Sequence, residues 1–208
     1  MRVVDKALQS VWHEEFQEGL REPGYCRIAV FGVGGAGSNT VNRLVEMGIQ
    51  GAECIAINTD MQHLNVVHAS NKVLIGEKTT RGLGSGGNPK IGRAAMEESI
   101  DKVESLLGNV DIAFVAAGMG GGTGTGAAPV IADMARRKGA IVIGVVTTPF
   151  RIEKGRGFYA AEGLAEMRKA CDTVVIIDNN KLMESVPHLP LNEAFGIADS
   201  VLANMIKG

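Results

Sequence analysis

The chain has 208 residues, of which 45% are hydrophobic and 21% are charged, a balance that predicts one large folded domain with a substantial core. Its 21 basic and 23 acidic residues leave a net charge of −2, which gives no electrostatic support for binding to nucleic acid or to an anionic membrane. The cysteines Cys26, Cys54 and Cys171 are isolated, so structural disulfides are not expected. No apolar run approaches the ~18 residues that span a bilayer, and the amino end lacks a signal-peptide pattern. We therefore expect a cytoplasmic protein without direct membrane insertion.

Residues 1–22 have apolar side chains at helical spacing and are followed by Pro23 and Gly24. This pattern predicts an amphipathic helix that ends there, so we divide the chain into an extension, residues 1–23, and a main domain, residues 24–208. A buried strand is predicted at residues 27–31, followed by a glycine-rich loop at 32–39 and a helix at 40–47.

The first glycine-rich loop contains Gly32, Gly34 and Gly37, which satisfy the GxGxxG dinucleotide fingerprint. The next predicted strand, residues 54–57, ends at Asn58-Thr59-Asp60. Asp60 lies near the spacing at which a dinucleotide-binding fold places its ribose-binding acid. These features alone favour an NAD-dependent oxidoreductase, which we keep as the alternative function.

A short strand at residues 73–75 leads to a second glycine-rich loop at 81–89, which by itself would be interpreted as a disordered surface loop. Pro89 is suited to the first turn of a helix, and this helix is predicted to continue to about Leu107. Its acidic side chains are interpreted as a solvated face: Glu97, Glu98, Asp101 and Glu104.

The strongest signal is the segment at residues 118–126, which holds six glycines together with Thr123 and Thr125. It follows a predicted strand at 111–117 and precedes a predicted helix at 127–139. Glycine-rich backbone between a strand and a helix directs N–H groups at an anion, and threonine hydroxyls add donors. The pattern therefore predicts phosphate binding.

Further strands are predicted at residues 140–147 and 173–177, with a helix to about Ala170 between them and a last helix from about Leu191 to Ile206. Alternating strands and helices predict an α/β fold: a doubly wound, mostly parallel, Rossmann-like sheet with helices on both faces. The glycine-rich loops would then meet at the carboxyl ends of the strands. Three such loops suit a nucleoside triphosphate better than a dinucleotide.

Several other classes find no support. The P-loop pattern GxxxxGK[ST] is absent, and no protein kinase set or GxSxG elbow is present. His63 and His68 are flanked by apolar residues, and we do not assign them to a metal site.

The segment Gly120-Gly121-Gly122-Thr123-Gly124-Thr125-Gly126 resembles the signature of the tubulin and FtsZ superfamily, and the surrounding motifs are similar to those of the FtsZ division GTPases. The resemblance runs from about residue 27 to the end of the chain. The supporting segments are residues 32–39, 58–60, 82–89, Pro149-Phe150 with Glu153, 179–182 and 193–199.

The resemblance implies a GTPase of prokaryotic cell division that binds GTP and GDP and assembles head-to-tail into filaments, recruited to mid-cell by anchoring proteins. Mg²⁺ is expected to be held mainly by the phosphates. The implied GTP-binding residues for the first phosphate loop and the strand after it are Gly34, Gly35, Ala36, Gly37, Ser38, Asn39 and Asp60. The γ-phosphate is assigned to Ser85, Gly86 and Gly87. The central cradle is assigned to Gly120, Gly121, Gly122, Thr123, Gly124, Thr125 and Gly126. Ribose and base are assigned to Pro149, Glu153, Arg156, Asn179, Phe195 and Asp199.

Two departures from the family pattern are visible. Arg156 follows Glu153 by one residue fewer than the family spacing. The sequence also stops within the family's central helix, so the acidic loop that completes hydrolysis on a neighbouring subunit, and the second domain, are not in it. No catalytic residue is therefore assigned within this chain, and the isolated chain is expected to bind GTP with little turnover. A non-hydrolysing module that caps or enters filaments is a third interpretation.

Overall fold

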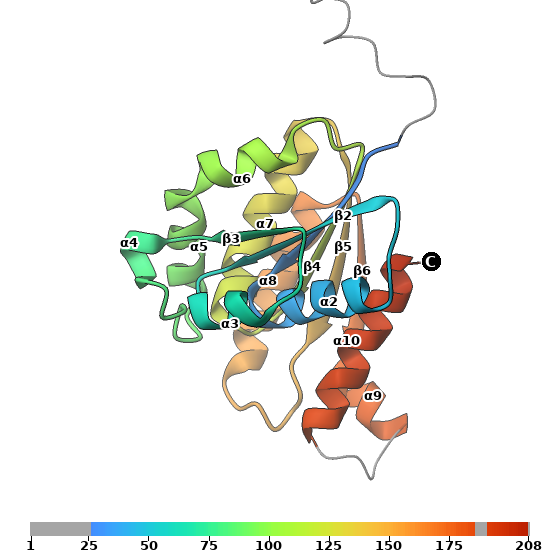
Figure 1. Ribbon diagram of the computed structural model, residues 1–208. Coiled ribbons are helices and arrows are strands. Elements are labelled where there is room, and N and C mark those ends of the chain that lie inside the picture. The colour runs from blue at the N-terminus through green and yellow to red at the C-terminus, as the bar shows by residue number, and fades with distance from the viewer. Residues whose placement is uncertain (1–25, 186–190, 208) are drawn as a thin grey trace, which may run out of the picture.

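The computed structural model describes residues 26–185 and 191–207. They form one six-stranded sheet with helices on both faces (Figure 1). The predicted helix at residues 1–22, Pro187 and Pro190 lie outside the described residues. In chain order the elements are β1 (Ile28–Val33), α2 (Gly34–Glu46), β2 (Ala52–Asn58), α3 (Met61–Val66), β3 (Asn71–Leu74), α4 (Glu77–Thr80), α5 (Pro89–Glu98), α6 (Ile100–Leu107), β4 (Ile112–Gly118), α7 (Gly122–Arg137), β5 (Ile141–Thr148), α8 (Arg156–Ala170), β6 (Thr173–Asp178), α9 (Asn179–Ser185) and α10 (Leu191–Lys207).

The strands are arranged in the order β3-β2-β1-β4-β5-β6, and all neighbouring strands are parallel. This is the order of a doubly wound dinucleotide-binding sheet, in which the winding direction reverses between β1 and β4. The predicted fold class is therefore confirmed. Ligands of such sheets bind at this reversal, beside the carboxyl ends of the strands.

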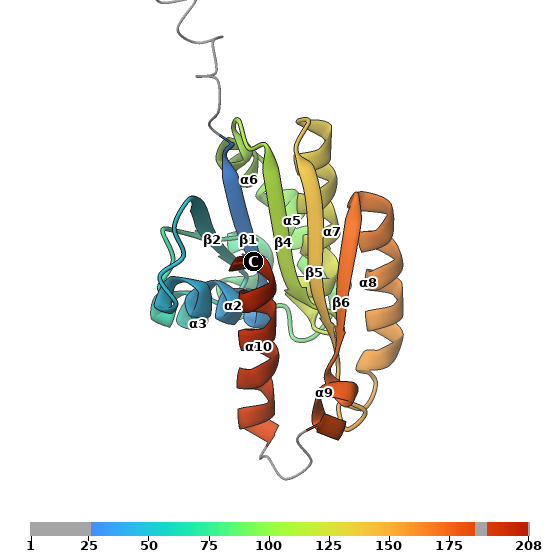
Figure 2. The same cartoon turned by 90° about the vertical axis from the view of Figure 1, so that its right-hand side faces the viewer.

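Both faces of the sheet are buried, which explains why the strands are apolar almost throughout rather than alternating with polar residues. Phe31 of β1 packs in a core with Met96, Ile131 and Met167, on the face covered by α5, α6, α7 and α8. The adjacent Val30 packs in a second core on the opposite face, where α2, α3 and α10 lie (Figure 2). Among the described residues, no helix combines the length and apolar character needed to cross a membrane.

The helices after the two strongest glycine-rich segments begin earlier than predicted. α2 begins at Gly34 rather than Thr40, and α7 begins at Gly122 rather than at residue 127. Glycine has low helix propensity, but close packing against the sheet outweighs it here. A Cβ on Gly37 would lie only 2.3 Å from the carbonyl oxygen of Ala116 in β4.

The helix predicted from Pro89 to about Leu107 is instead two helices, α5 and α6, which are separated at Ser99. The Ser99 hydroxyl accepts a 2.9 Å hydrogen bond from the backbone N–H of Gly76. Because Gly76 lies far from Ser99 in the sequence, the local pattern of residues 89–107 could not predict this contact.

Three short helices, α3, α4 and α9, were not predicted. The carboxylate of Glu98, which had been assigned to a solvated face, accepts hydrogen bonds at 2.9 Å from the backbone N–H groups of Lys78 and Thr79 in α4. The hydrogen bond from Lys78 is the main cause of the lowered pKa of Glu98. Glu98 is exposed, but it has a structural partner as well as solvent.

Candidate nucleotide-binding site

A pocket of about 220 Å³ lies at the reversal between β1 and β4. It collects residues from most of the predicted loops, so segments more than a hundred residues apart in sequence share one cavity. The predicted site residues that line it are Gly35, Ala36, Ser85, Gly121, Gly122, Thr123, Gly124, Pro149, Glu153, Arg156, Asn179 and Asp199. Four further lining residues were not assigned individually, although Gly118 and Met119 belong to the predicted phosphate-binding segment: Val33, Gly118, Met119 and Thr147.

Two of the helices that begin at this pocket, α2 and α7, have no side-chain cap. The N-cap residues of α2 and α7 are Val33 and Gly121, and no side chain at these positions accepts a hydrogen bond from the first turn. By contrast, α3 and α5 are capped by Asp60 and Asn88. The first N–H groups of α2 and α7 are therefore left for an anion, where the helix dipoles also favour negative charge.

At two glycines of this pocket, Gly35 and Gly121, neither the packing of the protein nor the backbone conformation requires a residue without a Cβ. A Cβ on Gly35 would be 3.8 Å from the His63 ring, and one on Gly121 would be 3.9 Å from the carbonyl oxygen of Gly118, both ordinary contacts. Neither glycine has a positive φ. Since both line the pocket, close approach of a ligand to the backbone accounts for them.

Other glycines of the same segments serve packing. A Cβ on Gly124 would lie 2.7 Å from the carbonyl oxygen of Gly118, and one on Gly126 would lie 2.1 Å from that of Pro89. Gly34 has a φ of 71° and lies against Gly124. The contact of Gly34 with Gly124 joins the first and central glycine-rich segments, and Gly126 packs the central segment against α5. Of these three glycines, Gly124 is the one that lines the pocket.

Three hydroxyl groups join three of the loops beneath the pocket. Thr123 Oγ1 lies 2.6 Å from Thr59 Oγ1 and 3.0 Å from Ser85 Oγ, and all three side chains are buried. The Thr125 hydroxyl accepts a 2.8 Å hydrogen bond from the N–H of Gly120. Thr125 and Gly120 therefore stabilise the central loop, whereas Thr123 and Ser85 also face the cavity.

Polar side chains gather at the other end of the pocket. Asn179 is 3% exposed, and its Oδ1 has no hydrogen-bond partner within the part of the chain that the structure describes. Burial raises the pKa of Asp199 to about 6, while a hydrogen bond from Asn39 and the charge of Arg43 oppose this shift. A buried amide and a carboxylate form a surface that can accept and donate hydrogen bonds to the edge of a base.

Glu153 and Arg156 also line the pocket. Their side chains form an ion pair, and Glu153 Oε1 also accepts a 2.9 Å hydrogen bond from the N–H of Phe150. The shortened spacing between them therefore still brings both side chains to the pocket.

Several other predicted residues with described side chains are not among those that line the cavity. Ser38 is fully buried, and its hydroxyl has no partner among the described residues. Asp60 caps α3 by accepting a 3.0 Å hydrogen bond from the N–H of His63, so its carboxylate has a structural role. Gly86 and Gly87 are exposed, with positive φ and free space around them. Phe195 lies in α10, and the role proposed for its side chain stays a prediction.

Comparisons with known proteins agree with this geometry. The family model described as Tubulin/FtsZ family, GTPase domain, matches residues 27–187. The chain is 59% identical over 187 residues to Cell division protein FtsZ 2 of Methanocaldococcus jannaschii, covering 90% of this chain and 49% of that protein. It is 54% identical over 201 residues to Cell division protein FtsZ 1 of Pyrococcus horikoshii, covering 96% of this chain and 54% of that protein. The chain thus spans about half the length of the curated relatives it matches.

Solved structures give the same result. An empty FtsZ dimer from M. jannaschii superposes with a TM-score of 0.86 at 46% identity, covering 99% of this chain and 58% of that one. CetZ2 from Haloferax volcanii, solved as a GTPγS-bound protofilament, superposes with a TM-score of 0.78 at 27% identity, covering 87% and 57%. These matches support the resemblance stated above and do not support the oxidoreductase alternative.

Proposed function

Because the chain belongs to the tubulin/FtsZ family, we propose that it binds GTP and GDP as the nucleotide-binding domain of a self-assembling GTPase of cell division. The domain comprises residues 24–208, and residues 1–23 form an extension. The relatives named above are cell division proteins, which supports a role in the cytoplasm at the division site.

The observation that carries this proposal is the polarity of the pocket. One end offers backbone N–H groups from two uncapped helices, α2 and α7, and the other offers Asn179 and Asp199. A nucleotide has the matching polarity, with phosphates at one end and a base at the other. Asp199 can accept hydrogen bonds from the N1–H and N2 amino group of guanine, and adenine would leave the carboxylate unpaired at a cost.

In this proposal, residues 35–39 and 122–125 hold the α- and β-phosphates, and residues 85–87 contact the γ-phosphate. The free hydroxyl of Ser38 and the exposed glycines of the 84–88 loop support these assignments. Glu153 binds the ribose and Phe195 stacks on the base. Mg²⁺ would be held mainly by the phosphates, since no cluster of three metal-ligating side chains occurs among the described residues.

Hydrolysis requires a group that positions the attacking water. Among the described residues that line the pocket, the carboxylates are Glu153 and Asp199, which the proposal assigns to ribose and base. We therefore expect the acidic groups to come from a neighbouring subunit in a head-to-tail filament. Relatives solved as a dimer and as a protofilament support self-association, and anchoring proteins would place the filament.

The test is to denature the purified chain, identify any released nucleotide, and then titrate GDP, ADP and NAD in competition. Released guanine nucleotide and a clear preference for GDP are the expected results. A preference for NAD would instead assign the site to the Gly32-Gly34-Gly37 fingerprint and overturn the proposal.

A further inference from the structure

We infer that Asn180, a residue to which the sequence assigned no role, clamps the loop after β5, residues 149–155, and thereby holds Glu153 in position for the ribose. The inference rests on the proposed function, in which Glu153 binds the ribose. Asn180 is half-buried in the first turn of α9 and directly follows Asn179. It does not line the pocket, so its effect on the ligand must pass through the loop.

Both ends of the Asn180 amide are hydrogen-bonded. Its Oδ1 accepts a 2.8 Å hydrogen bond from the backbone N–H of Arg151. Its Nδ2 donates to the carbonyl oxygen of Pro149 at 3.2 Å and to Asp178 Oδ1 at 3.1 Å. A backbone N–H only donates and a carbonyl oxygen only accepts, so the contacts with Arg151 and Pro149 fix the orientation of the amide. These two contacts are the Asn180 clamp.

Two successive peptide groups of the loop lie between Asn180 and Glu153. In the peptide group between Pro149 and Phe150, the oxygen accepts from the Asn180 amide, while the N–H donates to the carboxylate on the other side at 2.9 Å. In the peptide group between Phe150 and Arg151, the N–H donates to the Asn180 amide, while the oxygen accepts from the backbone N–H of Glu153 at 2.9 Å. The C=O and N–H of a trans peptide group point in opposite directions, which explains how one side of this strip binds the clamp and the other binds Glu153.

The clamp fixes the direction of the Glu153 carboxylate. The buried Phe150 side chain anchors the loop at one residue, but it does not by itself fix the rotation of the peptide groups on either side. Asn180 does so, because rotation of either group would break one of the two hydrogen bonds of the clamp. With the peptide groups fixed, the Phe150 N–H holds Glu153 Oε1, and Glu153 Oε2 pairs with Arg156.

The clamp also sets the spacing between the ribose contact and the base contact. Asn180 follows Asn179, whose buried amide lines the pocket at the base end. The loop that carries Glu153 is therefore fastened one residue away from a side chain assigned to the base. Asn180 is thus a positioning residue and not a catalytic one. It should affect recognition of the ribose and leave the phosphate end unchanged.

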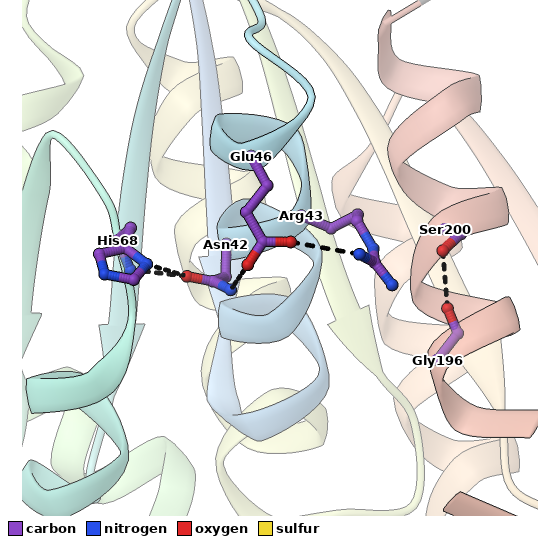
Figure 3. A network of polar contacts seen from close by, with 6 residues as sticks. All are labelled: Asn42, Arg43, Glu46, His68, Gly196 and Ser200. Atoms are coloured by element: carbon purple, nitrogen blue, oxygen red, sulfur yellow. Dashed lines mark hydrogen bonds and ion pairs between the residues drawn. The ribbon is translucent and has the colours of Figure 1, made fainter. Parts of the chain in front are cut away.

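The chain contains a matched control at Asn42, on the outer face of α2. Its Oδ1 accepts a 2.7 Å hydrogen bond from the backbone N–H of His68, and its Nδ2 donates to Glu46 Oε1 at 2.8 Å (Figure 3). The amide joins a backbone N–H to a carboxylate, as that of Asn180 does, but neither Asn42 nor these partners line the pocket. Asn42→Ala therefore removes comparable hydrogen bonds and leaves the loop after β5 intact.

The first experiment follows the backbone amides of the loop by hydrogen exchange in the absence of nucleotide. Asn180→Ala removes the acceptor of the Arg151 N–H, so exchange at Arg151 should become faster. The informative amide is that of Phe150, whose acceptor Glu153 is not altered by the substitution. It should also exchange about fivefold faster, the effect of one net hydrogen bond, because its peptide group is no longer held. Asn42→Ala should change neither amide.

The second experiment measures affinities by calorimetric titration for GTP, for dideoxy-GTP, which lacks both ribose hydroxyls, and for inorganic tripolyphosphate. Asn180→Ala should lower the preference for GTP over dideoxy-GTP about fivefold, with the affinities for dideoxy-GTP and tripolyphosphate unchanged. Asn42→Ala should leave the preference intact. In a Glu153→Ala background, Asn180→Ala should cause no further loss of preference, as expected of coupled residues.

The contradictory outcomes are distinct. Unchanged exchange at Phe150 in Asn180→Ala would mean that the loop keeps its shape without the clamp and would overturn the inference. Equal weakening of all three ligands, or equal losses with and without Glu153, would also overturn it, as would a wild-type chain that binds GTP and dideoxy-GTP equally. A wild-type chain that prefers ADP or NAD to GDP would instead refute the proposed function, and with it the role of the clamp in ribose binding.

Discussion

The two ends of the pocket are built from different parts of the polypeptide. The phosphate end consists mainly of backbone: the first turns of α2 and α7, with glycines that allow the two segments to pack closely. The base end consists of side chains, namely Asn179 and Asp199, which come from two separate helices.

Because of this difference, we expect the phosphate end to determine mainly the overall affinity for nucleotides and the base end to determine mainly the preference between bases. Backbone N–H groups are removed only by substitution with proline, and most other changes at the phosphate end act on packing before they act on binding. Side chains at the base end lie on α9 and α10 rather than on strands, so we expect that they can be changed with little effect on the sheet. We therefore expect substitutions at the phosphate end to change stability or overall affinity, and those at the base end to change discrimination.

The largest expected effect is on stability, from Gly37→Ala. The added Cβ would lie 2.3 Å from the carbonyl oxygen of Ala116 and 2.8 Å from the carbonyl carbon of Gly32, so α2 must move away from β1 and β4. We expect the free energy of unfolding to fall by about 3 kcal/mol, a typical upper value for overpacking. Denaturant unfolding of the two proteins measures it.

Gly35→Ala is the matched control two residues earlier. Its Cβ meets only ordinary contacts, so stability should be unchanged or slightly higher, since alanine favours helix over glycine. Nucleotide affinity should nevertheless fall by about tenfold or more, which corresponds to about 1.4 kcal/mol. Unchanged nucleotide affinity would mean that no ligand approaches this backbone.

The next effect is on discrimination, from Asp199→Ala. Loss of the hydrogen bonds to guanine should reduce the preference for GTP over ATP by about 1–3 kcal/mol, with tripolyphosphate affinity little changed. Competition titrations with the three ligands measure both quantities. The same relative affinity for GTP and ATP before and after the substitution would refute the assignment of Asp199 to the base.

Thr123→Ala should have a smaller effect that is shared by all ligands with a triphosphate. The substitution removes a hydroxyl that faces the pocket and contacts Thr59 and Ser85. We expect a loss of about 1–2 kcal/mol for GTP, ATP and tripolyphosphate alike, and Thr123→Ser should preserve binding. A change in base preference would contradict the placement of Thr123 at the phosphate end.

The strands and the loops of the pocket could be predicted from the sequence, because they depend on local sequence patterns. Apolar runs identified the strands, and the glycine-rich segments that follow them correctly indicated which loops meet at the pocket, because the carboxyl ends of parallel strands share one edge. The helix starts at Gly34 and Gly122 were missed, since glycine propensity favours loops and only the sheet packing makes these residues helical.

The contacts missed were those between distant segments. Ser99 interrupts a helix by binding Gly76, and Glu98 caps α4 from another helix. His63 was considered only as a metal ligand and set aside. A signal was nevertheless present, because His63 follows Asn58-Thr59-Asp60 closely, but the hydrogen bonds to Asn58 and Asn39 required the fold.

The smallest expected effect tests the base end by pH. Since burial raises the pKa of Asp199 to about 6, the carboxylate is charged at pH 7.5 and largely protonated at pH 5.5. Only the charged form accepts two hydrogen bonds from guanine, so GTP affinity should fall as the pH falls through 6. With a pKa near 6, the expected loss at pH 5.5 is about fourfold.

The control for this titration is ATP, whose phosphates change charge over the same range as those of GTP. The ratio of the two affinities therefore isolates the base end, and in Asp199→Asn this ratio should not vary with pH. The stability of the fold should change with pH in the opposite direction to GTP affinity. The pKa of Asp199 in the folded state lies above the ordinary value of 3.8, so the folded state binds more protons than the unfolded state between about pH 4 and 6. Protonation of Asp199 therefore favours folding as the pH falls. If lowering the pH raises the free energy of unfolding through Asp199 while it lowers the GTP-to-ATP affinity ratio, the charged carboxylate serves guanine binding and reduces the stability of the fold. A GTP-to-ATP ratio that does not change from pH 7.5 to 5.5 would show that guanine is recognised elsewhere.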